Sequence, residues 1–359
     1  MVFPLIPLYA ENLGCTASQI GVVVSSFSIL SMFLAIPVGT FLDKKSVTRT
    51  LFLGVVCNVI YSILLLFSVS LWMLFLAQIF GGLGFLVLIV STQAYISANS
   101  DRRSIEKSFG YLSFAAALGQ TLGPYMGGAI ITNWSFDYLF SFAVIFALFG
   151  LGSLKLQEPE KSSEHAVHKS TGNTKEIKSY LKDLSMLGIL IFTFVVVFAV
   201  SLRSSFIPVL FKSYGLNEQY LGFLISLFAL CMTLVRLGMS KLLDKCSRTF
   251  LLYSAFTCIL IGVSVLPHFS EKIILAGAMI IFGVGFGISQ PLSMVMVSDR
   301  SGGHTPGTAM GIRFTTITVA TFLSPLISGF LVDSVSLQAA FYLPSILITA
   351  AMGLIVFLI

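Results

Sequence analysis

Long apolar segments alternate with short polar connections along almost the whole chain. A helix needs about 20 apolar residues to cross a bilayer, and segments of this kind lie at 19–41, 49–68, 71–97, 108–131, 136–154, 187–209, 219–241, 249–268, 273–297, 308–330 and 337–359. The pattern predicts eleven complete membrane-spanning helices in an all-α membrane protein. The first residues, MVFPLIPLYAENLG, are too short to span, and they lack the basic n-region of a signal peptide.

One connection differs from the others because it is long and polar. Residues 155–184, which begin KLQEPEKSSEHAVHKS, are rich in charge and have no apolar face until their end. We expect this segment to be a linker between an N-terminal half, residues 1–154, and a C-terminal half, residues 185–359. Each half then contains about six helices.

The two halves repeat each other at one constant shift, which we call the repeat offset and which equals the separation of Pro7 from Pro208. Shared hydrophobicity cannot explain the Gly, Pro and Asp residues that this offset aligns, namely Pro7 with Pro208, Gly14 with Gly215, Gly21 with Gly222, Asp43 with Asp244, Gly82 with Gly283, Gly84 with Gly285, Gly110 with Gly311, Pro124 with Pro325 and Gly128 with Gly329. The repeat predicts duplicated six-helix architecture. The offset maps 187–209 onto positions before residue 1. The first of twelve helices is therefore represented only by its outer end, and either the chain is truncated or its true start lies upstream.

Composition supports a membrane protein and limits its chemistry. Hydrophobic residues make up 56% of the chain and charged residues only 10%, against about 25% charged in soluble domains. Five scattered Cys and four His show no metal-binding spacing, and there is no nucleophile motif or P-loop. We therefore expect no enzyme activity, no metal and no cofactor.

The net charge of +6 reflects the orientation of the helices in the membrane. Eighteen Lys and Arg fall on one side of the predicted helices, whereas only Lys212 and Lys272 fall on the other. This positive-inside bias predicts that the central loop is cytoplasmic. We expect a multi-pass protein of the plasma membrane. The bias also argues against a nucleic-acid partner.

The predicted helix 108–131 carries an unusual number of helix breakers. GYLSFAAALGQTLGPYMGG contains, at fixed spacing, Gly110, Gly119, Gly123, Pro124, Gly127 and Gly128. Glycines every four residues are typical of closely packed helices, which is one interpretation. Pro124 supports a second interpretation, because it frees the carbonyl of Gln120 from its helical hydrogen bond and permits a bend. The second half repeats the spacing with larger residues.

Two motifs resemble the major facilitator superfamily. The loop GTFLDKKSVTRTL, residues 39–51, matches the superfamily's pattern at Gly39, Asp43, Lys44 and Arg49, although Ser46 stands where Gly is usual. The helix-five motif at 110–128 is typical of exporters that work by antiport. The resemblance implies a twelve-helix (6+6) bundle with a pseudo-twofold repeat. It also implies alternating access to a central site.

The same resemblance implies gating residues at the cytoplasmic side. Besides the helix-five motif, we assign this role to Asp43, Lys44, Arg49, Asp244 and Arg248. A carboxylate near a helix N-terminus is stabilised by the helix dipole, so Asp43 could latch the start of 308–330 and Asp244 the start of 108–131. For the basic residues, the alternative is a polar loop that obeys the positive-inside rule.

Four polar residues within the spans are candidates for binding the substrate. Arg203 is a charge inside a span, which favours a functional site that attracts an anion, although it could instead snorkel to the outer surface. Gln93 and Gln290 occupy pseudo-equivalent places toward the inner ends of the fourth and tenth helices, and Gln120 joins them from the fifth. Hydrogen bonding between helices is the alternative for each glutamine.

The expected function is export of a small amphipathic or anionic molecule by alternating access, with proton antiport, by a monomer in the lipid bilayer. Proton coupling lacks an obvious carboxylate, because all fifteen Asp and Glu lie in loops or at helix ends. The coupling carboxylate could lie in the missing part of the first helix, or it could be Glu11, Asp137 or Asp333. The remaining alternative is that coupling does not involve protons. Gln78 also stands where antiporters usually carry Arg. A facilitator or importer of a metabolite, and a non-transporting sensor or assembly partner, remain alternatives.

Overall fold

The computed structural model of the chain describes residues 1–42, 47–99, 105–154, 180, 183–300 and 306–358. The first half contains η1 (Phe3–Leu5), α1 (Ile6–Asn12), α2 (Ala17–Leu42), α3 (Val47–Leu66), α4 (Leu71–Asn99), α5 (Ile105–Asn133) and α6 (Phe136–Ser153). The second half contains α8 (Leu184–Ser201), η3 (Leu202–Ser204), α9 (Ile207–Ser213), α10 (Glu218–Leu237), α11 (Met239–Lys245), α12 (Arg248–Val265), α13 (Lys272–Arg300), α14 (Pro306–Ser334) and α15 (Ala339–Leu358). The described residues contain no β-strand.

The all-α prediction is confirmed. The lipid that surrounds a spanning segment is the physical reason. Backbone polar groups find no water in lipid, so a spanning segment must satisfy them within a helix. Nine of the described helices are long and apolar enough to cross a membrane. α5 is not among them, since Gly, Pro and polar residues lower its mean hydropathy, and α15 contributes a shorter apolar stretch, Ala339–Ile355.

The helix boundaries follow the repeat closely. Three pairs of helices, α1 with α9, α4 with α13 and α5 with α14, begin and end at residues that the repeat offset aligns. Gly14 and Gly215, which the same offset aligns, have φ values of 78° and 75°, which suit glycine, in the turns that lead into α2 and α10. Asn217 then caps α10 by accepting a hydrogen bond from the Tyr220 amide (2.9 Å).

Two predicted helices are interrupted. The span 187–209 ends as α-helix at Ser201, passes through η3, and resumes as α9, which has Pro208 in its first turn. The hydroxyls of Ser204 and Ser205 donate to the carbonyl of Ser201, and such local bonds compete with helical ones. The span 219–241 breaks at Gly238, between α10 and α11.

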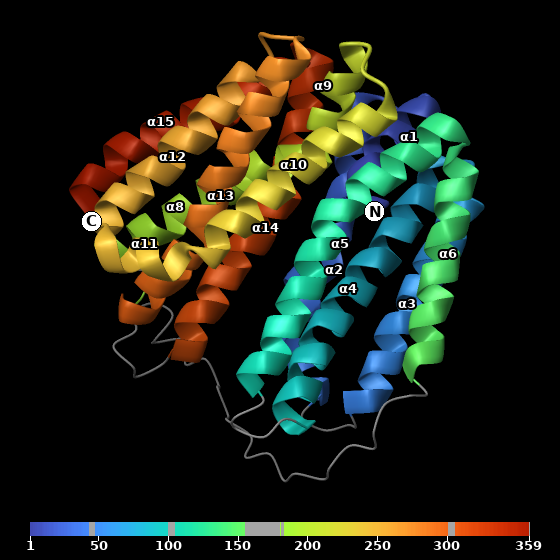
Figure 1. Cartoon of the computed structure of the whole chain (residues 1–359), viewed down its shortest axis with the longest axis horizontal. Coiled ribbons are helices and arrows are strands. Elements are labelled where there is room, and N and C mark those ends of the chain that lie inside the picture. Colours follow the sequence, from blue (N-terminus) through green and yellow to red (C-terminus); the bar gives the residue numbers. More distant parts are fainter. Residues whose placement is uncertain (43–46, 100–104, 155–179, 181–182, 301–305, 359) are drawn as a thin grey trace.

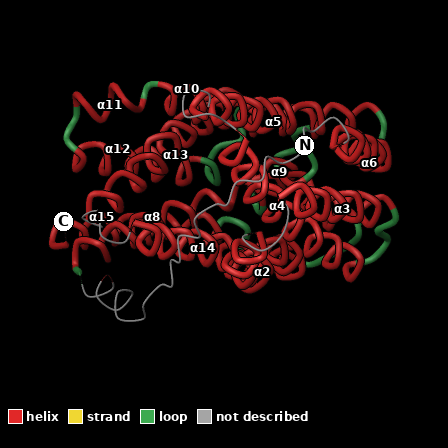
Figure 2. Tube along the Cα trace, turned by 90° about the horizontal axis from the view of Figure 1, so that it is seen from below, coloured by secondary structure: helices red, strands yellow, loops and turns green. Residues whose placement is uncertain are grey.

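The two halves lie side by side, with α2 to α6 on the right and α8 to α15 on the left of Figure 1. Two helix pairs join them, α2 with α14 and α5 with α10, and both pairs are visible in Figure 2. We call the end of the bundle where α2 and α4 finish and α3 and α5 begin the basic end, after Arg49, Lys107 and Arg300. The opposite end is the α1/α9 end.

Candidate functional site: the interface between the halves

Glycines bring the backbones of the two halves into contact. Gly222 of α10 lies against the carbonyl oxygen of Pro124 in α5, and Gly21 of α2 lies against that of Pro325 in α14. A Cβ at Gly222 or Gly21 would overlap that oxygen. Because the repeat offset aligns the two glycines with each other and the two prolines with each other, the same contact is built twice.

Two serines extend these contacts toward the middle of the bundle. Ser25 Oγ in α2 donates a hydrogen bond to the carbonyl of Phe322 in α14 (2.7 Å). Its counterpart Ser226 in α10 accepts one from the amide of Tyr125 in α5 (3.0 Å). The two bonds run in opposite directions, but they join the same pseudo-equivalent helix pairs.

Side chains also close the α1/α9 end. The carboxylate of Asp333, near the end of α14, accepts hydrogen bonds from the amides of Ala17 (3.0 Å) and Ser18 (2.8 Å) at the start of α2. Thr132 of α5 is the counterpart of Asp333 in the repeat, and its hydroxyl accepts from the amide of Gln219 in α10 (2.9 Å). Each half thus provides a side-chain cap for a helix N-terminus of the other.

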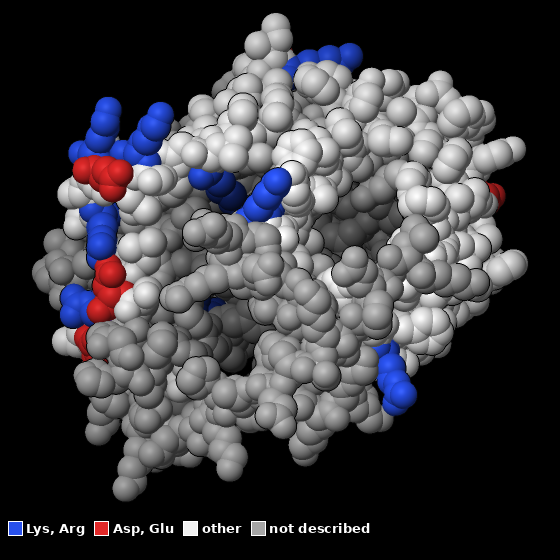
Figure 3. Space-filling view, turned by 60° about the horizontal axis from the view of Figure 1, so that its bottom comes forward, with Lys and Arg blue, Asp and Glu red and all other residues white. Residues whose placement is uncertain are grey.

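The described helices of the two halves lie apart at the basic end (Figure 1). All the contacts between them given above lie in the parts of the helices nearer the α1/α9 end. Toward the basic end, Tyr111 and Phe114 of α5 are 64% and 63% exposed, and Leu237 of α10 is 80% exposed. Figure 3 shows hollows on this face, with Lys and Arg side chains gathered mainly on its left side. The described conformation is therefore closed at the α1/α9 end and open at the basic end.

The helix-five motif divides into glycines that pack and glycines that do not. Gly123 and Gly127 face Met1 and η1 of their own half, whereas Gly128 faces the Glu218 carbonyl of α10. Close packing thus accounts for these three. A Cβ on Gly110 or Gly119 would have no neighbour within 4 Å.

Three of the other predicted gating residues are described, and they lie on helices at the basic end. Asp43 and Lys44 lie outside the described residues. Arg49 is exposed on α3, and Asp244 is exposed on α11 without an ion pair or hydrogen bond to any described residue. Arg248 forms an ion pair with Asp299 of its own half. The latch proposed for Asp244 would form only when the basic end closes, so it stays a prediction.

Arg203 lies on η3, at the break between α8 and α9. Its guanidinium carbon lies 5.1 Å from the ring centroid of Phe228, and its Nε atom is buried without a hydrogen-bond partner. Arg236, on the last turn of α10, lies 5.6 Å from the ring centroid of Phe286. The two rings stack on each other with centroids 6.1 Å apart. Arg203 therefore points into the bundle, and the snorkelling alternative does not fit.

Gln290 is engaged within its own half. Its Oε1 atom accepts a hydrogen bond from the guanidinium of Arg313 (2.9 Å), and Ser293 Oγ accepts another from Arg313 Nε (3.0 Å). Arg313 is only 7% exposed. The positive-inside count had assigned it to the loop side, yet its place inside the predicted span 308–330 was the signal that could have identified it.

Gln93 and Gln120 are exposed on α4 and α5. The repeat offset places Gln93 on Met294, one helical turn from Gln290. Gln93 and Gln290 are therefore not aligned residue for residue by the repeat, although their positions differ by only one helical turn.

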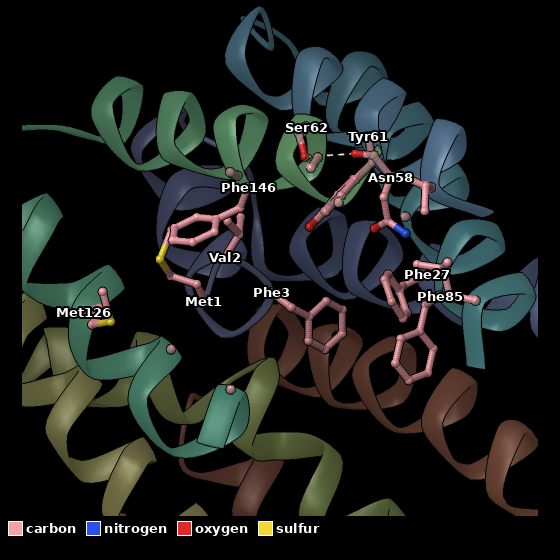
Figure 4. A pocket seen from close by; sticks show the side chains of 18 of the residues that line it. Met1, Val2, Phe3, Phe27, Asn58, Tyr61, Ser62, Phe85, Met126 and Phe146 are labelled. Atoms are coloured by element: carbon pink, nitrogen blue, oxygen red, sulfur yellow. Dashed lines mark hydrogen bonds between the residues drawn. The ribbon is translucent and has the colours of Figure 1, made fainter. Parts of the chain in front are cut away.

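A pocket of about 630 Å³ lies within the first half, among α3, α4, α5 and α6 (Figure 4). Apolar side chains such as Phe85 and Phe146 line most of it, and the hydroxyl of Tyr61 is buried there without a hydrogen-bond partner. In the second half, α8 packs among the corresponding helices α12, α13, α14 and α15. The pocket thus occupies the position of a helix in the repeat rather than the space between the halves.

The duplicated helical halves, joined by two pseudo-equivalent helix pairs, define a class of protein: a multi-pass membrane transporter. A family model described as Major Facilitator Superfamily matches residues 1–325, and the chain belongs to this superfamily. It is a transporter of small molecules rather than an enzyme.

Relatives of known name agree with this class. The chain is 25% identical to an uncharacterized MFS-type transporter of Methanocaldococcus jannaschii, covering 99% of this chain and 93% of that protein. It is 24% identical to multidrug resistance protein 1 of Bacillus subtilis (99% and 90% covered) and 24% identical to the quinolone resistance protein NorA of Staphylococcus aureus (96% and 88%).

Solved structures share the fold. The nucleoside transporter NupG superposes with a TM-score of 0.82 at 16% identity, covering 98% of this chain and 94% of that one. A bacterial homologue of the human lysosomal transporter Spinster, described as inward-facing and occupied, gives 0.74 at 12% identity, with 99% and 92% covered.

Proposed function

We propose that the protein exports a small amphipathic or anionic molecule across the plasma membrane by alternating access. The observation that carries the proposal is the pair of pseudo-equivalent interfaces, α2 with α14 and α5 with α10, which close one end of the bundle and leave the other open. Two such interfaces allow the halves to rock about a central site. The rocking units are residues 1–154 and 185–359, linked by residues 155–184.

Export is favoured over import by two observations. The helix-five motif at 110–128 retains all six positions typical of antiporting exporters, and two relatives are named for resistance to drugs or quinolones. The basic end then faces the cytoplasm, in keeping with the positive-inside rule. The described conformation is accordingly open to the side from which an exporter collects its substrate.

We propose proton antiport as the source of energy. A carrier of this kind takes up protons from the side to which it delivers substrate, so a gradient of protons can drive export. Asp333 is the one described carboxylate that joins the two halves by hydrogen bonds, which makes it the first candidate for coupling. No partner other than the substrate, protons and lipid is needed by this scheme, and a monomer suffices.

The test uses everted membrane vesicles that contain the protein, energised with an acidic interior. Export predicts accumulation of a transported dye inside these vesicles, abolished by a protonophore. It also predicts release of lumenal protons when dye is added, which a pH-sensitive probe in the lumen would record. Dye accumulation in right-side-out vesicles energised in the physiological direction would instead support an importer.

A further inference from the structure

Two arginines of the second half, Arg203 and Arg236, have no acidic partner among the described residues. Within the described part of the chain, the one salt bridge joins Arg248 to Asp299, far along the chain from Arg203 and on other helices. Neither Arg203 nor Arg236 forms an ion pair with a described residue, and Arg203 Nε has no hydrogen-bond acceptor there. A charge inside a membrane protein is costly unless it is paired. Arg203, whose Nε atom is buried, therefore needs another source of stabilisation.

Aromatic rings supply only part of it. Arg203 lies over Phe228, Arg236 lies over Phe286, and the two rings stack between them. A ring face attracts a cation, so each ring of the stacked pair holds one guanidinium group. Arg203 and Arg236 nevertheless carry like charges beside the same stacked pair of rings, so they repel each other. An anion between or beside them would relieve that repulsion.

Arg203 also lies where the two halves meet. Its 3₁₀ segment η3 contacts η1 of the first half, and Met1, which lies just before η1, packs against Gly123 of α5. Irregular backbone at membrane depth is tolerated where it is buried in protein or lines a cavity. The break at η3 thus places a cation beside the axis about which the halves would rock.

The two arginines differ in access. Arg236 is exposed on the last turn of α10, toward the open basic end, whereas Arg203 is half-buried and deeper. An incoming anion would therefore meet Arg236 before Arg203. Guanidinium groups are weakly hydrated and match the geometry of a carboxylate with two parallel N–H donors.

We propose that Arg203 and Arg236, braced by Phe228 and Phe286, form a binding site for an organic anion, with Arg203 as the inner and Arg236 as the entry contact. The site selects molecules that carry a carboxylate or a similarly delocalised negative charge on an apolar or aromatic body. The role of this site in transport rests on the proposed function, whereas the binding experiment below does not depend on transport.

The test compares two dyes of similar xanthene shape and opposite charge, fluorescein (anionic) and rhodamine 123 (cationic). Fluorescence anisotropy with the purified protein in a neutral detergent measures binding of each dye, independently of transport. The wild type is expected to bind fluorescein more tightly than rhodamine 123. Arg203→Gln should weaken fluorescein binding by about tenfold or more, Arg236→Gln by less, and Arg203→Lys should restore part of it.

Lys241→Gln is the matched control, because it removes one positive charge from an exposed position on α11 outside the site. It should leave fluorescein binding unchanged. Should Arg203→Gln not fold, Arg203→Lys and Arg236→Gln carry the test. Equal binding of both dyes by the wild type, or unchanged fluorescein binding in the arginine variants, would overturn the proposal.

Failure of the export proposal would look different. If fluorescein binds through Arg203 but accumulates in right-side-out rather than in everted vesicles, the anion site stands and the export direction is wrong. If rhodamine 123 accumulates in those vesicles while fluorescein neither binds nor competes, export stands and the anion site is wrong.

Discussion

The Asp333 carboxylate accepts a hydrogen bond from the amide of Ser18 at 2.8 Å, across 315 positions of sequence. A second bond reaches Asp333 from the amide of Ala17. Asp333 belongs to the second half and Ala17–Leu42 to the first, so this acid joins the halves through the N-terminus of α2. The sequence suggested a contact of this type for Asp43 and Asp244 at the basic end. The structure places one at the α1/α9 end.

Replacing Asp333 with Asn should favour opening of the α1/α9 end. The variant loses the charged acceptor, and charge–dipole stabilisation at an exposed helix end is about 0.3–1 kcal/mol, enough to change the ratio of open to closed states by up to about fivefold. Labelling of Cys15 by a membrane-impermeant maleimide reports this opening, in a protein whose other four cysteines are replaced by Ser. Cys15 is partly buried, and this burial raises the pKa of its thiol, so opening of that end should increase the labelling rate.

The control for this measurement is Glu271→Gln, which removes an exposed acid near the start of α13, at the same end of the bundle. It should label at the wild-type rate. Equal labelling rates for Asp333→Asn and the wild type would show that the two hydrogen bonds do not hold the end closed.

Replacing Gly222 with Ala should destabilise the protein. The added Cβ would overlap the carbonyl oxygen of Pro124, and forcing a methyl group into a packed contact typically costs about 1–3 kcal/mol. A lower melting temperature in detergent would record this. Gly110→Ala is the matched control, because its Cβ would have no neighbour within 4 Å. A Gly222 variant as stable as the Gly110 variant would contradict the close-packing interpretation.

Replacing Pro124 with Ala should slow turnover while the protein still inserts normally. Alanine restores an N–H that can donate to the carbonyl of Gln120, which straightens the helix and shifts the Pro124 carbonyl from its contact with Gly222. Initial rates of dye uptake into everted vesicles measure the change, which we expect to be a few-fold. Pro344→Ala in α15 is the control. Unchanged rates would restrict Pro124 to a packing role.

Replacing Gln290 with Leu should lower stability, because Arg313 then loses an acceptor for its buried guanidinium. A buried donor left without its partner costs about 1–3 kcal/mol, more when it is charged. Gln120→Leu removes an exposed amide instead and should leave the melting temperature unchanged. If Gln290 served only the substrate, the two variants would melt alike and differ only in dye binding.

The sequence by itself determined the helices and the repeat. Hydrophobic length, together with Gly and Pro, acts locally, which is why the ends of α4 and α13 fall at residues that the repeat offset aligns. Because these signals are local, the sequence did not predict the helix break at residues 202–206. An apolar run hides a helix break that depends on Ser hydroxyls bonding to the carbonyl of Ser201.

Only the tertiary structure decided how the halves meet. Asp333 looked like one more acid at a helix end until its two partners from the other half were known, and Arg313 looked like a loop charge until Gln290 and Ser293 were seen around it. Which end of the bundle is closed, and which charges face each other without a counter-ion, depend on contacts between segments far apart in the chain. Hydrophobicity and helix propensity act over a few neighbouring positions and do not carry that information.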